Sequence, residues 1–231
     1  MTDAHCHVSC GDPSVRELLV GRDFFGVHPW ETLDGAKAEV PFLAELRAKL
    51  LANPKAGVGE IGLDRLKVRD IPPFMREVFE AQLALAFELR RPVVLHGAKC
   101  WGQVVAEVRS LNACPPLTQT LKPSNPQTLP PLLFHGFSRS DGLIPDIVKL
   151  NGFISVGPAV LNDHAVNYRE LVKKIPLDRL LVETDRTEAN AAECPSVRDV
   201  LAKVAELRGI SAAEIEEITD ENASRFFGAP L

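Results

Sequence analysis

The sequence predicts an α/β protein with a TIM-like (β/α) barrel followed by C-terminal helices. Short apolar runs that are typical of buried strands recur along the chain, and helix-length amphipathic segments separate most of them. Several runs, such as PVVLH and PLLFH, are almost continuously apolar, as expected for parallel strands covered on both faces. Many of them end on histidine or on a carboxylate, which predicts one shared site at the carboxyl ends of the strands.

Seven runs are clear enough to be predicted as strands, one short of a closed eight-stranded barrel, so the barrel is expected to be distorted. The deficit lies between His7 and His28, where the sequence offers one plausible short helix around Ser14–Val20. Either a degenerate strand lies there or the barrel lacks one unit. The predicted strands are Thr2–His7, Phe24–His28, Ala56–Ile61, Pro92–His96, Leu132–His135, Phe153–Val156 and Leu180–Glu183.

Helical spacing is clearest in Phe74–Leu89, where apolar residues recur every three or four positions between charged ones. Asn112–Pro131 is rich in Pro, Thr, Ser and Asn and is predicted to be an irregular loop. Near the C-terminus, Ser211 and Glu214 form a capping-box pattern that opens one helical segment, and Asn222–Phe227 is predicted to form a second. The strand rhythm continues on both sides of the loop, so residues 1–231 are expected to be a single domain.

Composition is typical of a globular protein and gives no support to a nucleic-acid-coating or membrane protein. Of the 231 residues, 45% are hydrophobic and 25% charged, and the net charge of −5 repels polyanions, so any phosphate must be held locally. The five cysteines contain no CxxC pair, which favours a reducing, cytoplasmic setting over a disulfide framework. Neither a secretory leader nor a membrane-length apolar stretch is apparent, and no obligate protein partner is indicated.

The first strand carries an HxH pattern. Alternate side chains of a strand share a face, so Asp3, His5 and His7 are expected to point one way and Cys6 the other. Two imidazoles at a strand end can bind one divalent ion, although HxH alone is a weak indication. Combined with ligand-type side chains at the ends of other strands, it predicts a metal centre made of His5, His7, Glu60, His96, His135 and Asp185.

Imidazole and carboxylate ligands suit zinc, manganese or iron, with magnesium less favoured by so many nitrogens. Two such ions need a bridging anion to offset their repulsion, and Glu60 is the candidate bridge. The pair would activate a water molecule as a nucleophile, while Asp185 orients that water and shuttles its proton. This chemistry is that of a metal-dependent hydrolase.

Seven blocks, DAHCH, GVHPW, GEIGLD, PVVLH, HGFSRS, VETD and ENASRFF, occur in an order and approximate spacing that resemble the TatD-type metal-dependent deoxyribonucleases. That family is a branch of the amidohydrolase-like barrels, and the resemblance covers nearly the whole chain. It implies two divalent metals on the six ligands named above, with His28 beside them at the site. The implied activity is hydrolysis of phosphodiester bonds at DNA ends.

The chain departs from the family pattern in three places. An arginine usually stands two residues after His96, where this chain has Ala98 followed by Lys99. The family tends toward a proline-containing turn after the ETD block, which here continues with Arg186. The segment between the first two histidine strands is also shorter than usual. Metal binding should survive these changes, but substrate choice is affected, and the candidate phosphate-binding residues are Lys99, Arg139 and Arg186.

Two other functions stay open: hydrolysis of a small amide, lactone or phosphoester on the same metals, and a non-catalytic metal-binding barrel. Simpler roles also stay open for single residues. His28 could bond to a backbone carbonyl, Asp185 could cap a helix, and Trp30 or Trp101 could stack on a base or wall the cleft.

Residues outside the six ligands have expected roles of their own. Asp3 is expected to orient a ligand imidazole from behind. Asp64 is expected to pair with Arg65 or Lys67. His164 is expected at the surface, and Cys10 is expected to be inert.

Overall fold

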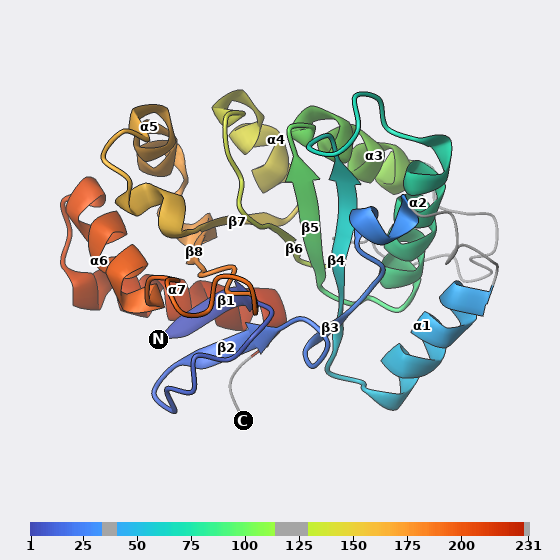
Figure 1. The fold of residues 1–231 in the computed structure, drawn as a ribbon, viewed down its shortest axis with the longest axis horizontal. Coiled ribbons are helices and arrows are strands. Elements are labelled where there is room, and N and C mark those ends of the chain that lie inside the picture. Colours follow the sequence, from blue (N-terminus) through green and yellow to red (C-terminus); the bar gives the residue numbers. More distant parts are fainter. Residues whose placement is uncertain (34–40, 114–128, 229–231) are drawn as a thin grey trace.

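The computed structural model describes residues 1–33, 41–113 and 129–228, and its described part contains eight parallel strands (Figure 1). Each strand pairs in parallel with its neighbour in sequence order wherever a ladder forms. The strands are β1 Thr2–Cys6, β2 Arg16–Leu19, β3 Phe24–Phe25, β4 Gly57–Asp64, β5 Val93–Ala98, β6 Leu132–Phe134, β7 Gly152–Val156 and β8 Leu180–Val182.

The ring of strands closes through short links. β1 and β2 form one sheet and β3 to β8 a second, and a bridge between Val20 and Phe24 joins the two. On the other side, the Asp185 N–H donates to the His5 carbonyl at 3.0 Å, which ties the segment after β8 to β1. The predicted TIM-like barrel is therefore present, with the full eight strands.

The eighth strand, β2, lies where the sequence suggested a short helix around Ser14–Val20, so the helix prediction was wrong. The alternative of a degenerate strand is the one that the structure shows. β2 pairs in parallel with β1, with Thr2 opposite Arg16. Its sequence RELL shows no apolar alternation, because its two buried residues are consecutive and one of them is a glutamate: Glu17 is 8% exposed and Leu18 is 2% exposed.

Helices connect the strands and cover their outer faces. Figure 1 shows α2 and α3 beside β4 and β5, and α6 and α7 beside β8 and β1. The helix predicted at Phe74–Leu89 is present as α2, shifted by one residue. None of the described helices is both long and apolar enough to cross a bilayer. The α-helices are α1 Pro41–Ala52, α2 Pro73–Glu88, α3 Trp101–Ala113, α4 Ile144–Lys149, α5 Val166–Lys174, α6 Val197–Arg208 and α7 Ala212–Phe227.

Several predicted boundaries need correction. β3 ends at Phe25 instead of His28, and β4 continues to Asp64 instead of ending at Ile61. The predicted loop Asn112–Pro131 starts late, because α3 continues through Ala113; residues 114–128 lie outside the described part, and β6 begins at Leu132 as expected. The Ser211 hydroxyl does accept the Glu214 N–H at 3.2 Å. The segment Asn222–Phe227 is not a separate helix, because no glycine or proline interrupts α7.

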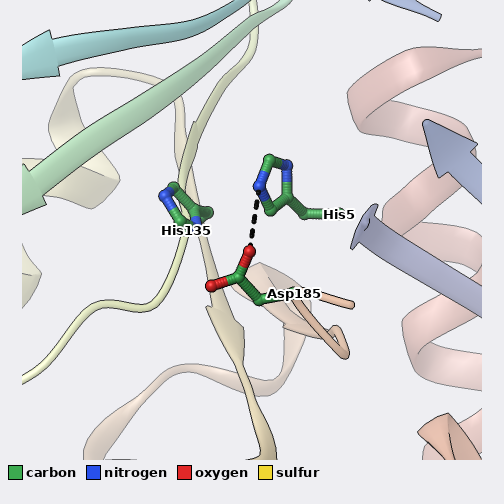
Figure 2. Close-up of side chains that lie close together, drawn as sticks. All are labelled: His5, His135 and Asp185. Carbon is green, nitrogen blue, oxygen red and sulfur yellow. Dashed lines mark ion pairs between the residues drawn. The ribbon is translucent and has the colours of Figure 1, made fainter. Parts of the chain in front are cut away.

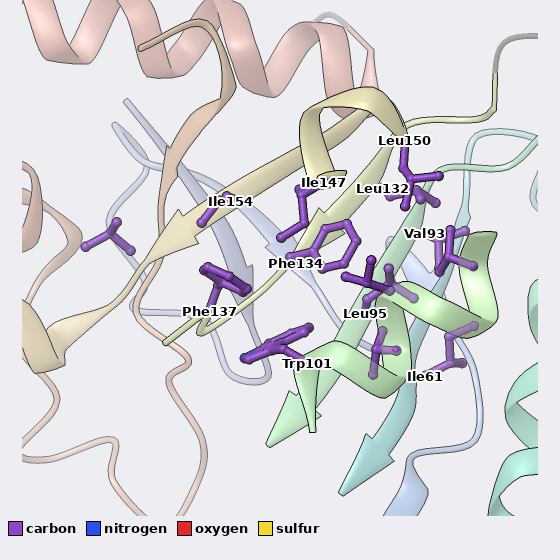
Figure 3. Close-up of a cluster of buried hydrophobic side chains, with 14 of the residues drawn as sticks. Ile61, Val93, Leu95, Trp101, Leu132, Phe134, Phe137, Ile147, Leu150 and Ile154 are labelled. Carbon is purple, nitrogen blue, oxygen red and sulfur yellow. The ribbon is translucent and has the colours of Figure 1, made fainter. Parts of the chain in front are cut away.

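A first apolar cluster fills the space between the strands and the outer helices. Figure 3 shows Leu95, Phe134 and Ile154 from neighbouring strands beside Trp101 from α3 and Phe137. The Trp101 ring lies 5.7 Å from that of Phe134 and 5.3 Å from that of Phe137. This packing holds β5, β6 and β7 in register and so fixes the positions of the residues that follow them.

A second cluster fills the inside of the barrel and is closed by α7. Phe226 stacks on Phe24 with ring centroids 5.9 Å apart, and Asn222 donates to the carbonyls of Leu177 and Leu180, at the start of β8. Because α7 seals the N-terminal end of the strands, the open end is the carboxyl end. The buried members are Ala4, Leu18, Phe24, Val94, Leu133, Phe153, Leu181, Ala223 and Phe226.

Candidate metal centre

The structure brings together all six side chains that the sequence predicted as metal ligands. They come from five strands or from the first three residues after them, and all lie at the carboxyl end of the barrel. His5 is on β1, Glu60 on β4 and His96 on β5. The other three follow the ends of β1, β6 and β8; they are His7, His135 and Asp185.

Glu60 lies at the centre of this group, only 4% exposed. One of its oxygens, Oε1, lies 2.5 Å from His96 Nδ1 and 2.6 Å from His135 Nε2. The other, Oε2, lies 3.4 Å from His5 Nε2 and 3.3 Å from His7 Nε2. A single carboxylate therefore separates the imidazoles into two sets, one on each oxygen.

Asp185 completes the set that contains His5 and His7. Its Oδ1 lies 3.7 Å from His5 Nε2 and 3.6 Å from His7 Nε2, and its side chain is 49% exposed. Figure 2 shows Asp185 converging with His5 and His135, whose ring centroids are 4.2 Å apart. Asp185 holds a positive φ of 49°, which is uncommon for a residue other than glycine. Its backbone is part of the closure with β1 and not a helix cap.

The charges of the group are strongly coupled. Burial by itself raises the pKa of Glu60, but the neighbouring imidazoles, His135 first, outweigh it and hold that pKa well below its usual value. For His135, burial lowers the pKa, yet Glu60 and Glu183 hold it well above its usual value. Hydrogen bonding to Glu60 raises the pKa of His7. The cluster therefore favours ionised carboxylates facing positive charge.

Several buried nitrogens in the site have no hydrogen-bond partner among the described residues. They are both ring nitrogens of His5, which is fully buried, and Nδ1 of His135. Such atoms are rare because leaving them unpaired costs free energy. Three groups of side chains could each hold an ion, because the ligand atoms within each group lie within 4.8 Å of one another. The groups are His5 with His135 and Asp185, His5 with His7 and Glu60, and His28 with Glu60 and His96. Donor set and geometry fit divalent metal ions.

Asp64 corrects a sequence-based expectation. It does not pair with Arg65 or Lys67, but lies with Oδ2 2.7 Å from His96 Nε2. Burial raises the pKa of Asp64, but hydrogen bonds from His96, the Leu66 N–H and the Trp30 side chain outweigh it and lower the pKa. A carboxylate behind a ligand imidazole fixes the orientation of the ring.

Glu183 is a site residue that sequence reasoning missed. It is 1% exposed, and its Oε1 accepts the Gly136 N–H at 2.7 Å and lies 3.8 Å from His135 Nδ1. Its Oε2 accepts the Ser155 hydroxyl at 2.5 Å. The sequence signal was that Glu183 itself ends the predicted strand Leu180–Glu183, so the VETD block places two carboxylates at one strand end.

Asp3 has a different role from the one expected. Its carboxylate does not contact an imidazole ring; it accepts the Thr184 N–H at 3.0 Å and the Thr184 hydroxyl at 2.6 Å. It also accepts the backbone N–H of His5 at 3.4 Å. Asp3 therefore joins β1 to the segment after β8 and positions His5 through the main chain.

His28 lies beside the six ligands. Its Nδ1 accepts the Trp30 N–H at 3.1 Å, and so caps the short helix Pro29–Thr32, while its Nε2 lies 3.5 Å from Glu60 Oε1. The expected alternative, a bond to a backbone carbonyl, is not what the structure shows. Because Nδ1 is an acceptor, the neutral ring carries its proton on Nε2, facing the site.

A cleft of about 1150 Å³ opens from the site across the segments after β6, β7 and β8. Of the predicted phosphate-binding residues, Arg139 is exposed and lines this cleft together with Asp185. Arg186 donates to the Ala191 carbonyl at 2.5 Å and so braces its own loop. Lys99 is exposed directly after β5, but does not line the cleft.

The remaining candidates also have clear positions. His164 is exposed just before α5 and lines the far part of the cleft. Cys10 is exposed, and its N–H donates to Glu17 at 2.6 Å. Trp101 is 4% exposed in the core and cannot stack on a substrate, whereas Trp30 is 39% exposed beside His28.

Comparison with known proteins agrees with this geometry. The model of the family described as TatD related DNase matches residues 21–228. The chain belongs to this family. It is 31% identical over 226 residues to the metal-dependent hydrolase YabD of Bacillus subtilis, covering 91% of this chain and 80% of that protein. It is also 31% identical over 216 residues to the 3'-5' ssDNA/RNA exonuclease TatD of Klebsiella pneumoniae, covering 88% and 75%.

The fold of this TatD-family chain is likewise found in solved structures. The TatD homologue YJJV of Escherichia coli K12 superposes with a TM-score of 0.72 at 26% identity, covering 95% of this chain and 79% of that one. A TatD-family hydrolase of Entamoeba histolytica superposes with a TM-score of 0.68 at 17% identity, which supports the fold alone. The chain is thus a metal-dependent hydrolase of the TatD family, acting on ester bonds.

Proposed function

We propose that this hydrolase is a nuclease that cleaves phosphodiester bonds at DNA ends with two divalent metal ions. The observation that carries the proposal is the position of Glu60, whose two oxygens each face a separate set of imidazoles. A carboxylate in that position can bridge two cations and offset their repulsion. A relative at 31% identity is named as an exonuclease on single-stranded DNA and RNA, which supports a nucleic-acid substrate.

The proposed ligands fall into two sets, according to which Glu60 oxygen they lie near. His5, His7 and Asp185 lie on the Oε2 side of Glu60, and His96 and His135 on the Oε1 side. When bound, two divalent ions lower the pKa of a water molecule and polarise the phosphoryl oxygen. Zinc, manganese and magnesium are the candidate ions, and the nitrogen-rich donor set favours the first two.

Charge explains why metals would be needed for a phosphate substrate. Asp64 and Glu183 stand behind the imidazoles, and Glu60 and Asp185 among them, so the bare centre holds four carboxylates. These would repel a phosphodiester at close range. Two divalent ions would bring four positive charges and reverse that repulsion.

The chain's own acid–base groups are Asp185 and His28. The half-exposed Asp185 carboxylate lines the open cleft, where it can orient a water molecule and accept its proton. His28 presents Nε2–H to the site, 3.5 Å from Glu60 Oε1, and can donate to an oxygen of the substrate.

The cleft favours an oligonucleotide over a small ester. Its volume of about 1150 Å³ exceeds the roughly 300–1000 Å³ that enclose an ordinary small ligand. Arg139 lines it without a hydrogen-bonding or ionic partner among the described residues, and is available for a phosphate. A second candidate, a small amide, lactone or phosphoester, is favoured by Ala98, which replaces the arginine usual in the family.

A rate comparison separates the two functions. Purified protein reconstituted in turn with Zn²⁺, Mn²⁺ and Mg²⁺ would be given an end-labelled oligonucleotide and a panel of small neutral esters and amides. We expect stepwise shortening of the oligonucleotide with a kcat/KM well above that for any ester. A preference for the esters would replace the nuclease assignment, and metal binding without turnover on either panel would favour a non-catalytic barrel.

The four described cysteines are free thiols, which supports a cytoplasmic location.

A further inference from the structure

An aromatic side chain forms one wall of the metal centre. Trp30 is the second residue of the short helix Pro29–Thr32, which His28 caps, and it is 39% exposed. Its ring centroid lies 5.0 Å from that of His28 and 6.5 Å from that of His96, both in edge-to-face geometry. The only other tryptophan of the chain, Trp101, is buried.

Trp30 is held in place although it is exposed. Its backbone N–H donates to His28 Nδ1 at 3.1 Å, and its ring packs edge-on against the rings of His28 and His96. Pro29 precedes it and restricts the backbone further. An exposed indole with a fixed orientation beside reacting groups is suited to binding a planar ligand.

A cation accompanies the indole. The Lys67 ammonium lies 3.7 Å from the centre of the Trp30 ring, and the Lys67 side chain is exposed. Lys67 has no hydrogen bond or ion pair to any other described residue. A cation over an exposed aromatic ring is held weakly, whereas a nucleobase that stacks on such a ring gains roughly 5- to 150-fold in affinity. A base can therefore displace Lys67 and leave the ammonium free to contact an adjacent phosphate.

We propose that Trp30 is the stacking platform for the unpaired base next to the scissile phosphate, with Lys67 contacting a neighbouring phosphate. This inference rests on the proposed nuclease function and names the feature of the substrate that the site recognises. A base inside a duplex is already stacked on both faces, so the platform selects single-stranded ends. An oligonucleotide with an abasic end keeps its phosphates but has no base to stack on Trp30.

The test compares two otherwise identical single-stranded oligonucleotides, one with normal terminal nucleotides and one with abasic terminal nucleotides. We expect kcat/KM for the normal strand to exceed that for the abasic strand by about tenfold or more in the unaltered protein. The ratio should fall to about one in Trp30→Ala and be largely kept in Trp30→Phe. Leu66→Ala is the matched control, since Leu66 is a nearby exposed apolar side chain (54%). The ratio does not depend on the fraction of folded protein.

Binding provides a second measurement. A phosphorothioate oligonucleotide that resists cleavage should quench the tryptophan emission of the unaltered protein, and Trp30→Phe should abolish that quenching. Lys67→Ala should lower the slope of log affinity against log salt by about 0.7, the value for one phosphate contact with a single strand.

An unchanged normal-to-abasic ratio in Trp30→Ala would overturn the platform while leaving the nuclease function in place. Failure of the unaltered protein to cleave any oligonucleotide, together with cleavage of small esters, would overturn both.

Discussion

His96 lies between two carboxylates, with Nε2 2.7 Å from Asp64 Oδ2 and Nδ1 2.5 Å from Glu60 Oε1. Because Asp64 accepts from Nε2, the neutral ring keeps its proton there and turns the Nδ1 lone pair toward the centre of the site. Asp64 thus decides which nitrogen of His96 is available as a ligand. The same carboxylate accepts the Leu66 N–H, so it is itself fixed.

Removing Asp64 should therefore weaken the metal centre without unfolding the protein. We expect Asp64→Ala to lower metal affinity by about 10- to 100-fold, and Asp64→Asn, which retains an acceptor oxygen, to lower it less. Titration calorimetry with Zn²⁺ and Mn²⁺ measures both. Asp163→Ala serves as control, since Asp163 is an exposed carboxylate in a surface ion pair with Arg169. Equal affinities for Asp64→Ala and the unaltered protein would rule out this positioning role.

The HxH pair should be needed for metal binding. We expect His5→Ala combined with His7→Ala to lower metal content and abolish hydrolysis while the barrel stays folded, because both side chains lie within 3.4 Å of the same Glu60 oxygen. Elemental analysis, an activity assay and circular dichroism check the three statements. Full activity in this double variant would show that the site has been placed wrongly.

Metal removal should lower the stability of the unaltered protein. A ligand that binds only the native state at 100 times its Kd adds about 2.7 kcal/mol to the free energy of unfolding. A chelator should therefore lower Tm, and the ion that restores it most at equal concentration is the preferred metal. The His5→Ala, His7→Ala variant supplies the control, because its Tm should hardly respond. A chelator effect of the same size in both proteins would mean that the metal acts elsewhere.

Much of the barrel and of the site followed from the sequence, because apolar runs with ligand-type ends are local features. The same reasoning failed for buried carboxylates whose hydrogen-bond partners are distant in the sequence. Asp64 looked like a surface acid beside Arg65, whereas its partner His96 is 32 residues away. Glu183 was passed over for the same reason. The strand β2 was left only as an alternative to a short helix, because Glu17 lies inside it and its sequence has no apolar pattern.

Glu17 gives a pH-dependent prediction. Its two oxygens accept the Ser9 hydroxyl at 2.5 Å and the Cys10 N–H at 2.6 Å, and so hold the loop that follows His7. Burial raises the pKa of Glu17, but these hydrogen bonds outweigh it and leave the pKa below its usual value. A lowered pKa stabilises the fold above the unfolded-state pKa of about 4.3, and this contribution is lost as pH falls.

We therefore expect Glu17→Gln to reduce the free energy of unfolding by about 1–3 kcal/mol at pH 7, and by less near pH 4. Urea unfolding at both pH values measures the difference between variant and unaltered protein. Glu188→Gln, at an exposed position, should change neither value. A deficit that stays constant between the two pH values would show that the charge of Glu17 does not contribute.

Gly62 links the backbone of β4 to the position of His96. The two residues are paired across β4 and β5, Gly62 has a φ of 155°, and an added Cβ would overlap the His96 carbonyl oxygen. Gly62→Ala should therefore force the two strands apart, cost about 1–3 kcal/mol or more, and weaken metal binding along with stability. Thermal unfolding and metal titration of the same preparation measure both effects.

Gly102→Ala is the opposite case, because Gly102 lies in α3 and an added Cβ there meets nothing within 4 Å. It should stabilise the protein by about 0.5–1 kcal/mol and leave metal affinity unchanged. If Gly62→Ala lowered stability but left metal affinity intact, the strand pairing would matter for folding alone. The backbone of β4 would then not be what holds His96 against Glu60.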